Sequence, residues 1–234
     1  EPAINQYGAT LLDLCEVKKF KATKGSIHSV ICSRYGKTLQ FQGKIIILAA
    51  GALQSPAILL RSASDEYPNG LANSSDQVGR NLMRHYIDIY AISAKQKPHD
   101  DDYQKQIAFN DLYYSDDGRL GTVQSFGKLP PTEIQVATIR QKLKNSPLPF
   151  LVNIFDLFKP IAEFFAMTIF SKRVILSSIM EDMPYSTNRI TISTNGDVVM
   201  EYKINSTERN RIKLFRKKMK KVLKSYSYIL IKQA

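Results

Sequence analysis

The sequence of 234 residues has no Trp, two Cys and three His, and these shortages exclude several classes of protein. With only Cys15 and Cys32, the chain can form neither a disulfide scaffold nor a cysteine-rich zinc site. The eleven glycines form no G-x-G-x-x-G and no P-loop, and H-E-x-x-H, C-x-x-C and G-x-S-x-G are also absent. From the residues alone we therefore assign no metal ligand and no catalytic residue.

The few histidines limit general acid–base chemistry to three positions. His28 lies beside turn residues in an expected strand and His99 lies in an acidic turn, so we expect ordinary solvated or hydrogen-bonded side chains at both. His85 closes a distinctive segment, but a structural hydrogen bond suits it better than proton transfer. The neighbouring acids Glu181 and Asp182 are expected on opposite faces of a strand, as turn or surface residues.

Positive charge is concentrated at the carboxyl end. The chain has 33 basic and 21 acidic side chains and a net charge of +12. Residues 202–234 hold 11 Lys/Arg and one Glu, so this tail accounts for +10 and the first 201 residues for only +2. The whole-chain charge therefore does not indicate a nucleic-acid partner.

The tail itself reads as a basic amphipathic helix over residues 209–224. Ile212, Phe215, Met219 and Val222 recur at helical spacing and are expected on one face, with Lys and Arg on the other. A packed surface helix is the favoured interpretation. The alternative is a binding module in which this helix contacts nucleic acid or an anionic membrane.

The most apolar long stretch, residues 148–170, is expected to form amphipathic helices rather than a membrane span. It contains Asp156, Lys159, Pro160 and Glu163, and charged residues are costly in lipid. Nothing else in the sequence supports membrane association.

The first hundred residues predict short strands and then a buried one. Strands are expected at residues 12–20, 27–33 and 38–42, with turns around Gly25 and Gly36. Residues 45–50, IIILAA, are a continuous apolar run, typical of a strand buried on both faces in a parallel sheet. Ser55 and Pro56 favour a helix that begins there, with Ser as its cap and Pro in its first turn. In an open α/β sheet ligands lie beyond the carboxyl ends of strands, which places Ala50-Gly51-Ala52 at such an end.

The remainder of the chain predicts an antiparallel layer with helices. Strands are expected from Tyr86, near residues 107–109, and at 122–126 and 174–180. Asn195-Gly196 lies between two alternating runs, 189–193 and 198–202, and indicates a hairpin. Residues 130–170 favour helices. The predicted fold class is α/β, more exactly a mixture of helices with both kinds of sheet.

Three segments together resemble the glucose–methanol–choline (GMC) oxidoreductases. Residues 45–62, IIILAAGALQSPAILLRS, are similar to the second signature of that family, and residues 78–85, VGRNLMRH, to the segment that follows it. Residues 181–184, EDMP, with 188–191, NRIT, resemble the later strand region. The order and spacing also agree. Arg84 departs from the family pattern, in which Asp is frequent at this position.

The resemblance implies part of an FAD-binding Rossmann-like domain, followed by an antiparallel-sheet substrate domain with helices. On this basis we expect the remainder of the FAD-binding domain at residues 1–95, the substrate domain at 96–205 and the basic amphipathic helix at 206–234. The implied activity is that of a flavin-dependent oxidoreductase, which transfers a hydride from the CH–OH group of an alcohol or sugar to FAD. The implied partner is thus a small-molecule alcohol or sugar; the electron acceptor and the compartment are not indicated.

The resemblance implies few individual site residues. Val17 matches the strand valine whose backbone contacts the adenine side of FAD, although a plain buried strand residue explains it equally well. Ala50 and Gly51 would pass near the cofactor. The Gly-rich pyrophosphate cradle and the late catalytic His of the family have no counterpart in the sequence. We therefore expect the middle of such an enzyme, a chain that by itself neither holds FAD tightly nor turns over.

Overall fold

A computed structural model describes residues 2–93, 105, 107–114, 118–125, 136–137, 140–141, 143–144, 146–170 and 173–232. The chain divides into two compact units. Unit 1 comprises Glu1–Met83 and Met183–Lys203, and unit 2 comprises Arg84–Asp182 and Ile204–Ala234. This grouping follows compactness alone, and the functional division at residues 95 and 205 stays a prediction.

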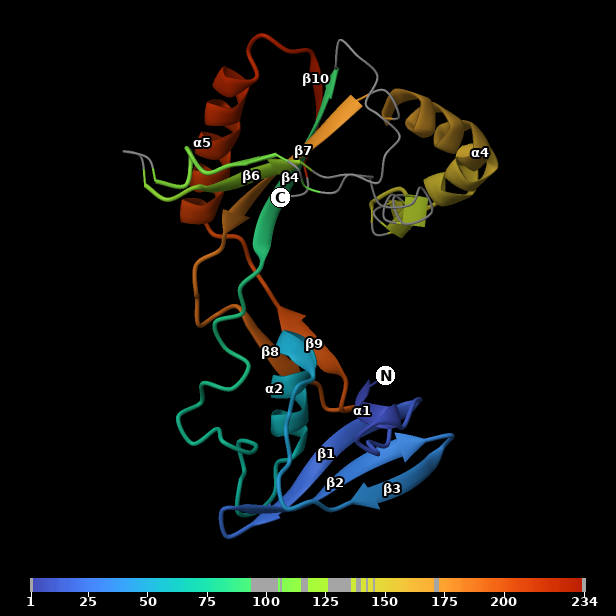
Figure 1. Ribbon diagram of the computed structural model, residues 1–234, viewed down its shortest axis with the longest axis vertical. Coiled ribbons are helices and arrows are strands. Elements are labelled where there is room, and N and C mark those ends of the chain that lie inside the picture. The colour runs from blue at the N-terminus through green and yellow to red at the C-terminus, as the bar shows by residue number, and fades with distance from the viewer. Residues whose placement is uncertain are drawn as a thin grey trace. The chain divides into compact units, whose positions relative to one another are not determined.

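Unit 1 begins with a short helix, α1 (Pro2–Asn5), and a three-stranded antiparallel sheet of β1 (Cys15–Thr23), β2 (Ser26–Arg34) and β3 (Lys37–Phe41), in the order β1-β2-β3 (Figure 1). The two connections are two-residue turns, Lys24-Gly25 and Tyr35-Gly36, in which all four residues have positive φ. Glycine at the second position suits such turns, which match the twist of antiparallel strands. The predicted strands and turns are confirmed here.

The prediction of a buried strand at residues 45–50 is wrong. This stretch forms no strand, and no described residue pairs with it in a sheet. Ile45 and Ile47 are 83% and 84% exposed, whereas Ile46 and Leu48 pack against the core formed by Phe20, Ile58 and Leu71. The run is therefore covered on one side only, because every described strand pair of the chain is antiparallel and none supplies the expected parallel neighbours.

Helix α2 (Gly51–Arg61) begins earlier than predicted. Ser55 does not cap it from outside but lies within it, where its Oγ accepts the amide of Ala50 at 3.2 Å. Pro56 is the sixth helical residue, not the first. It is tolerated because the residue four positions back, Ala52, is exposed, so that water can satisfy the carbonyl that lacks a donor.

The predicted hairpin around Asn195-Gly196 is confirmed as β8 (Arg189–Ile192) and β9 (Val198–Glu201). It belongs to unit 1, although it follows unit 2 in the sequence. The hairpin contacts α2, and the Nε of Arg61 donates a hydrogen bond to the carbonyl of Gly196 at 2.9 Å.

Unit 2 is built on a five-stranded antiparallel sheet in the order β10-β4-β7-β6-β5. Its strands are β4 (His85–Ser93), β5 (Ala108–Phe109), β6 (Gly121–Ser125), β7 (Arg173–Glu181) and β10 (Tyr228–Lys232). The antiparallel layer predicted for the later chain is confirmed, except that Phe126 lies outside the described residues and β10 was not predicted. The mixed class of helices and sheets is likewise confirmed.

Two helices accompany this sheet. Helix α4 (Leu151–Phe170) fulfils the helical prediction for its region. Helix α5 (Ser206–Val222) buries Ile212, Phe215 and Met219 as predicted, but Val222 is 47% exposed and Leu223, just beyond the helix, is buried instead. The final turn departs from regular helical spacing there, so the periodicity fails by one residue. None of the described helices combines the length and hydropathy that a membrane crossing requires.

The start of α5 gives a first testable prediction. Asn205 is its N-cap, and the side-chain Oδ1 accepts the amide of Glu208 at 3.0 Å. We expect Asn205→Ala to lower the free energy of unfolding by about 1 kcal/mol, because an orphan amide then loses its partner. Urea unfolding followed by circular dichroism measures it. Asn205→Asp keeps an acceptor and should be near neutral; equal losses in both variants would contradict the cap.

Candidate functional site

The three residues that the resemblance places near a cofactor all lie in unit 1. Val17 is a half-buried residue of β1, opposite Cys32 of β2, and packs against the core of Phe20, Ile58 and Leu71. Ala50 and Gly51 are exposed at the start of α2. Both interpretations of Val17 fit this position, since its side chain is a core residue while β1 is the edge strand of its sheet.

The backbone at Gly51 is open to approach. Its φ is +75°, in the left-handed region that favours glycine, and a Cβ added there would meet no atom within 4 Å. Ala50 offers no side chain that caps the helix, and the residues from Ala49 to Ala52 are all small and exposed. A flat group could therefore reach the main chain of this turn without meeting a side chain.

These residues fit one wall of an FAD site. Small side chains and an uncapped helix start permit the close contact with backbone amides that a dinucleotide needs. A pyrophosphate cradle of several glycines is absent from the sequence, so these residues do not provide the whole site. The residues that would hold the group are thus Ala50 and Gly51, with Val17 as a further main-chain contact.

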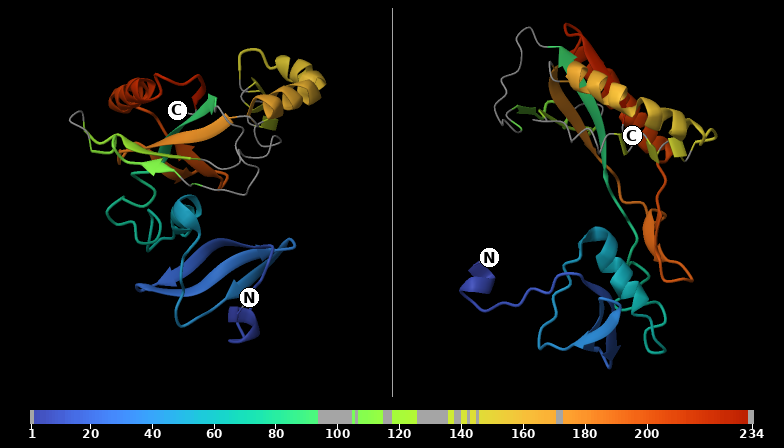
Figure 2. Two further views of the ribbon diagram at one scale, coloured as in Figure 1. Left: turned by 45° about the horizontal axis from the view of Figure 1, so that its top comes forward. Right: turned by 90° about the vertical axis from the view of Figure 1, so that its right-hand side faces the viewer.

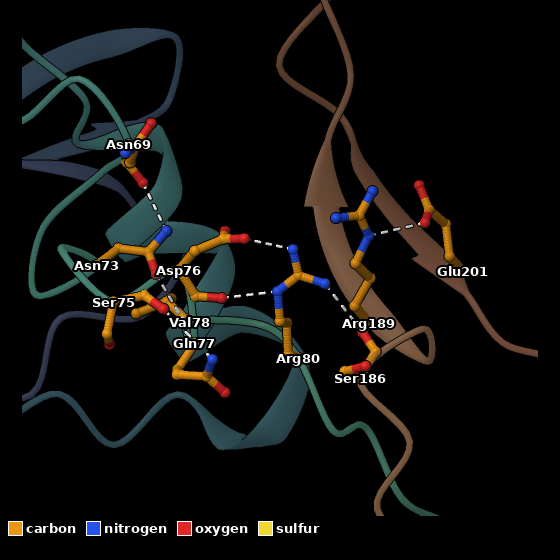
Figure 3. A network of polar contacts seen from close by, with 10 residues as sticks. All are labelled: Asn69, Asn73, Ser75, Asp76, Gln77, Val78, Arg80, Ser186, Arg189 and Glu201. Atoms are coloured by element: carbon orange, nitrogen blue, oxygen red, sulfur yellow. Dashed lines mark hydrogen bonds and ion pairs between the residues drawn. The ribbon is translucent and has the colours of Figure 1, made fainter.

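A pocket of about 230 Å³ lies between α2, the loop from residue 68 to 80, and β8 of the same unit. Leu60, Pro68 and Ile190 form part of its apolar lining, and Arg80 and Arg189 bring two guanidinium groups to it. Figure 3 shows the polar contacts on this side of unit 1.

Each guanidinium of the pocket already holds a carboxylate (Figure 3). Arg80 pairs with Asp76 and also donates to the carbonyl of Ser186 at 3.2 Å, while the Nε of Arg189 donates to Glu201 at 2.8 Å. The hydrogen bond from Arg189 lowers the pKa of Glu201 and in turn raises the pKa of Arg189. The charges balance, so the network fastens the loop to the hairpin rather than attracting an anion.

Gly79 explains why the resembling segment VGRNLMRH carries a glycine at its second position. The carbonyl of Gly79 accepts the amide of Ile190 at 2.8 Å, and a Cβ there would lie 2.4 Å from the carbonyl oxygen of Ile190. The φ of +85° adds a second requirement for glycine. The segment thus lies against β8 at a distance that no side chain permits.

The predicted titratable candidates do not come together. The Nε2 of His28 shares a hydrogen bond with the hydroxyl of Thr23, which agrees with the satisfied histidine expected. His85 is an exposed residue at the start of β4, and His99 lies outside the described residues. Among the described residues, no three His, Cys, Asp or Glu side chains cluster as a metal site.

The expectation that Asp182 is a surface acid is wrong. Asp182 is 7% exposed and accepts the hydroxyl of Tyr86 at 2.6 Å and the amide of Arg84 at 3.3 Å. Its neighbour Glu181 is exposed and bonds the hydroxyl of Tyr113. The two acids take opposite sides as strand alternation requires, but one side is the interior of unit 2.

Sequence reasoning missed the buried ion pairs that fasten α5 to the sheet. Arg216 donates two hydrogen bonds to Asp88 of β4, at 2.6 and 2.9 Å, and Asp88 is 5% exposed. Arg211 holds the fully buried Glu208 at 2.6 Å. The available signal was Asp88 itself, an acid between apolar residues in a predicted strand, which needs a buried partner.

Beside this ion pair, Tyr90 of β4 is 1% exposed. Burial, chiefly, and the nearby Asp88 raise the pKa of Tyr90 to about 12. Its ring centroid lies 5.8 Å from that of Tyr228 on β10. A phenol that stays protonated among satisfied partners is a packing residue and is not poised to exchange protons near neutral pH.

Comparison with known proteins supports the resemblance. Residues 1–87 match the family model described as GMC oxidoreductase. The chain is 28% identical over 131 residues to 2-methyl-1,2-propanediol dehydrogenase of Mycolicibacterium austroafricanum, an alignment that covers 54% of this chain and 24% of that protein. It is 45% identical over 75 residues to 5-(hydroxymethyl)furfural oxidase of Methylovorus sp. (strain MP688), covering 30% of this chain and 14% of that protein.

A third relative is the fructose dehydrogenase large subunit of Gluconobacter japonicus, 50% identical over 42 residues, or 18% of this chain and 8% of that protein. The matches thus span a quarter or less of the curated relatives' own lengths. All three relatives are named as dehydrogenases or oxidases. The family match covers α2 with Ala50 and Gly51, the VGRNLMRH segment and the β1–β3 sheet, and on these residues the chain belongs to the GMC oxidoreductases, a family of FAD-binding enzymes.

Proposed function

We propose that this chain supplies one wall of the FAD site and the substrate-domain sheet of an oxidoreductase that acts on CH–OH groups of a small alcohol or sugar. The family match over residues 1–87 supports the cofactor, and the names of the relatives, which include a propanediol and a fructose dehydrogenase, support the substrate class. The functional division at residues 95 and 205 is part of this proposal.

The observation that carries the proposal is the open main chain at Gly51. The turn from Ala49 to Ala52 presents exposed backbone and small side chains at the start of an 11-residue helix. Its amides can face a negatively charged or polar edge of the cofactor, and the helix dipole favours that orientation. Val17 would contribute main-chain contacts from the edge strand of its sheet.

The chemistry supplied by bound FAD is acceptance of a hydride from the alcohol carbon, which leaves a carbonyl product once the hydroxyl proton has moved to a base. We assign that base to no residue of this chain. His28 is bonded to Thr23, and Asp182 is committed to Tyr86 and Arg84. The role of this chain is therefore to position the cofactor and to form the substrate-domain sheet, and by itself we expect it to show no turnover.

The proposal predicts that bulk at Gly51 prevents flavin binding. We expect Gly51→Gln, in the product of the complete reading frame, to weaken FAD binding at least about tenfold, the effect of roughly 1.4 kcal/mol, because the new side chain occupies the approach to the backbone. The ratio of flavin to protein absorbance after titration with FAD measures this.

Gly36→Gln is a matched control for that experiment. Gly36 has φ +74° against +75° for Gly51, and a Cβ at either position meets nothing within 4 Å, so the backbone strain is the same. The control should retain the FAD affinity of the unchanged protein. Equal losses in both variants would reject the assignment of Gly51, and an unchanged protein that cannot be reconstituted with FAD would reject the proposed function itself.

A further inference from the structure

Helix α4 of unit 2 presents an apolar surface to solvent. Leu157, Phe164 and Ile161 are 74%, 67% and 54% exposed, values typical of charged surface residues. We define the apolar arc as Ile154, Leu157, Phe158, Ile161 and Phe164. At 3.6 residues per turn these five fall within about a third of the helix circumference, so they form one continuous strip.

The charged residues of α4 lie on the other side of the helix, toward the rest of the unit. Asp156 is bound by Arg140 at 3.0 Å, and Lys159 pairs with Glu163 at 3.8 Å. The side chains of Asp156 and Glu163 are only 37% and 28% exposed, less than any residue of the apolar arc. A helix on the surface of a globular domain has the opposite arrangement, with its apolar stripe turned inward.

The chemistry of the apolar arc favours lipid as its cover. All five side chains are hydrocarbon, so the strip offers no hydrogen-bonding group over three turns of helix. Protein interfaces usually combine an apolar centre with polar and charged groups that fix orientation. A helix with one apolar face and charges on the opposite side is instead suited to lie in the plane of a membrane interface.

The charge of unit 2 is complementary to an anionic lipid surface. Residues 206–234 contain ten Lys/Arg and one Glu, and Lys217, Lys220 and Lys221 of α5 are exposed. Both views of Figure 2 place α4 and α5 on the same side of the unit 2 sheet. The hydrocarbon strip and the basic helix can therefore meet one surface together.

We propose that unit 2 docks on anionic membranes, with the apolar arc of α4 buried at the level of the headgroups and the lysines of α5 against the lipid phosphates. The helix lies in the interface and does not cross the bilayer. Burial of the arc supplies most of the affinity, and the lysines make binding dependent on anionic lipid and on salt. This inference stands on the described contacts of unit 2 and is independent of the proposed flavin chemistry.

The absence of Trp allows a direct test of insertion, since one introduced Trp is the only indole in the chain. We expect the fluorescence of Phe164→Trp to shift to shorter wavelength when the chain is mixed with vesicles of phosphatidylcholine and phosphatidylglycerol. Tyr7→Trp, at a position of unit 1 that is 82% exposed, is the control and should not shift. No shift for Phe164→Trp, or the same shift in the control, would overturn the proposal.

A flotation experiment with the same vesicles measures the energetics. We expect Leu157→Gln combined with Ile161→Gln to reduce the bound fraction at least about tenfold, because two inserted side chains become polar. The matched control replaces two exposed apolar residues of unit 1, Leu11 and Met200, by Gln and should bind as the unchanged chain does. Vesicles of phosphatidylcholine alone, or high salt, should weaken binding of the unchanged chain.

The remaining occupants of the strip give distinct outcomes. If a second copy covers the arc, the unchanged chain will elute as a dimer without lipid, the Gln variant will elute as a monomer, and neither will float. If only the lysines act, Leu157→Gln with Ile161→Gln will float as the unchanged chain does. Either result would overturn insertion of α4.

Discussion

Asp88→Asn is expected to lower the free energy of unfolding of unit 2 by about 3–5 kcal/mol. The side chain of Asp88 is 6% exposed, and Arg216 meets it with two hydrogen bonds from α5. Removing the negative charge leaves a guanidinium without its counter-charge in the interior, where the desolvation penalty is largest. Urea unfolding, followed by circular dichroism, measures the loss.

Two further variants test the cause of that loss. Glu201→Gln breaks an Arg–Glu pair of similar length whose side chains are 35% and 47% exposed, and should cost less than about 1 kcal/mol because solvent screens it. Asp88→Leu combined with Arg216→Met removes both charges and should be more stable than Asp88→Asn alone. If the double variant is the least stable of the three, the penalty does not come from an unpaired buried charge.

Gly79→Ala is expected to destabilise unit 1 by about 2–5 kcal/mol. Adopting a φ of +85° costs a residue with a side chain roughly 1–2 kcal/mol. The methyl group would also lie 2.4 Å from the carbonyl oxygen of Ile190, and relieving such overpacking costs about 1–3 kcal/mol more. The same chemical unfolding experiment, with tyrosine fluorescence as a second probe, measures the loss.

Gly196→Ala separates the two contributions. Gly196 has φ +84° in the β8–β9 turn, and a Cβ there meets nothing within 4 Å. This control should therefore lose only the conformational part, about 1–2 kcal/mol. A loss as large as that of Gly79→Ala would mean that the approach of residues 78–82 to β8 does not depend on glycine.

Local patterns in the sequence predicted much of the fold because the elements concerned are local. The hairpins around Gly25, Gly36 and Gly196 depend on turn chemistry within a few residues. Periodicity identified α5, since Ile212, Phe215 and Met219 face its packed side. Strand periodicity likewise located β4 and β7, which are long and pair along their full lengths.

The errors occur where a local pattern depends on a distant partner. An apolar run such as residues 45–50 becomes an interior strand only if neighbours pair with it, and no described strand does so; Ile45 and Ile47 are exposed in consequence. Asp182 looked like a turn acid because its partner, Tyr86, lies 96 positions away. For the same reason the Asp88–Arg216 pair, 128 positions apart, carries no local signal.

For the candidate site, the sequence identified the segment but not its geometry. The resemblance located Ala50 and Gly51, and the structure adds that their backbone is open while the predicted strand before them is absent. The family match therefore rests on the sequence of residues 1–87 and not on a parallel sheet.

The path of the chain also has consequences for synthesis on the ribosome. Residues 78–82 bond to the segment at 186–190, and the Arg80–Ser186 contact joins positions 106 residues apart. Everything between them belongs to unit 2, so the nascent amino-terminal unit remains incomplete until nearly the whole of the other has emerged. Folding with such a high contact order is slow, and chaperones that shield the waiting VGRNLMRH segment should raise the yield of native protein.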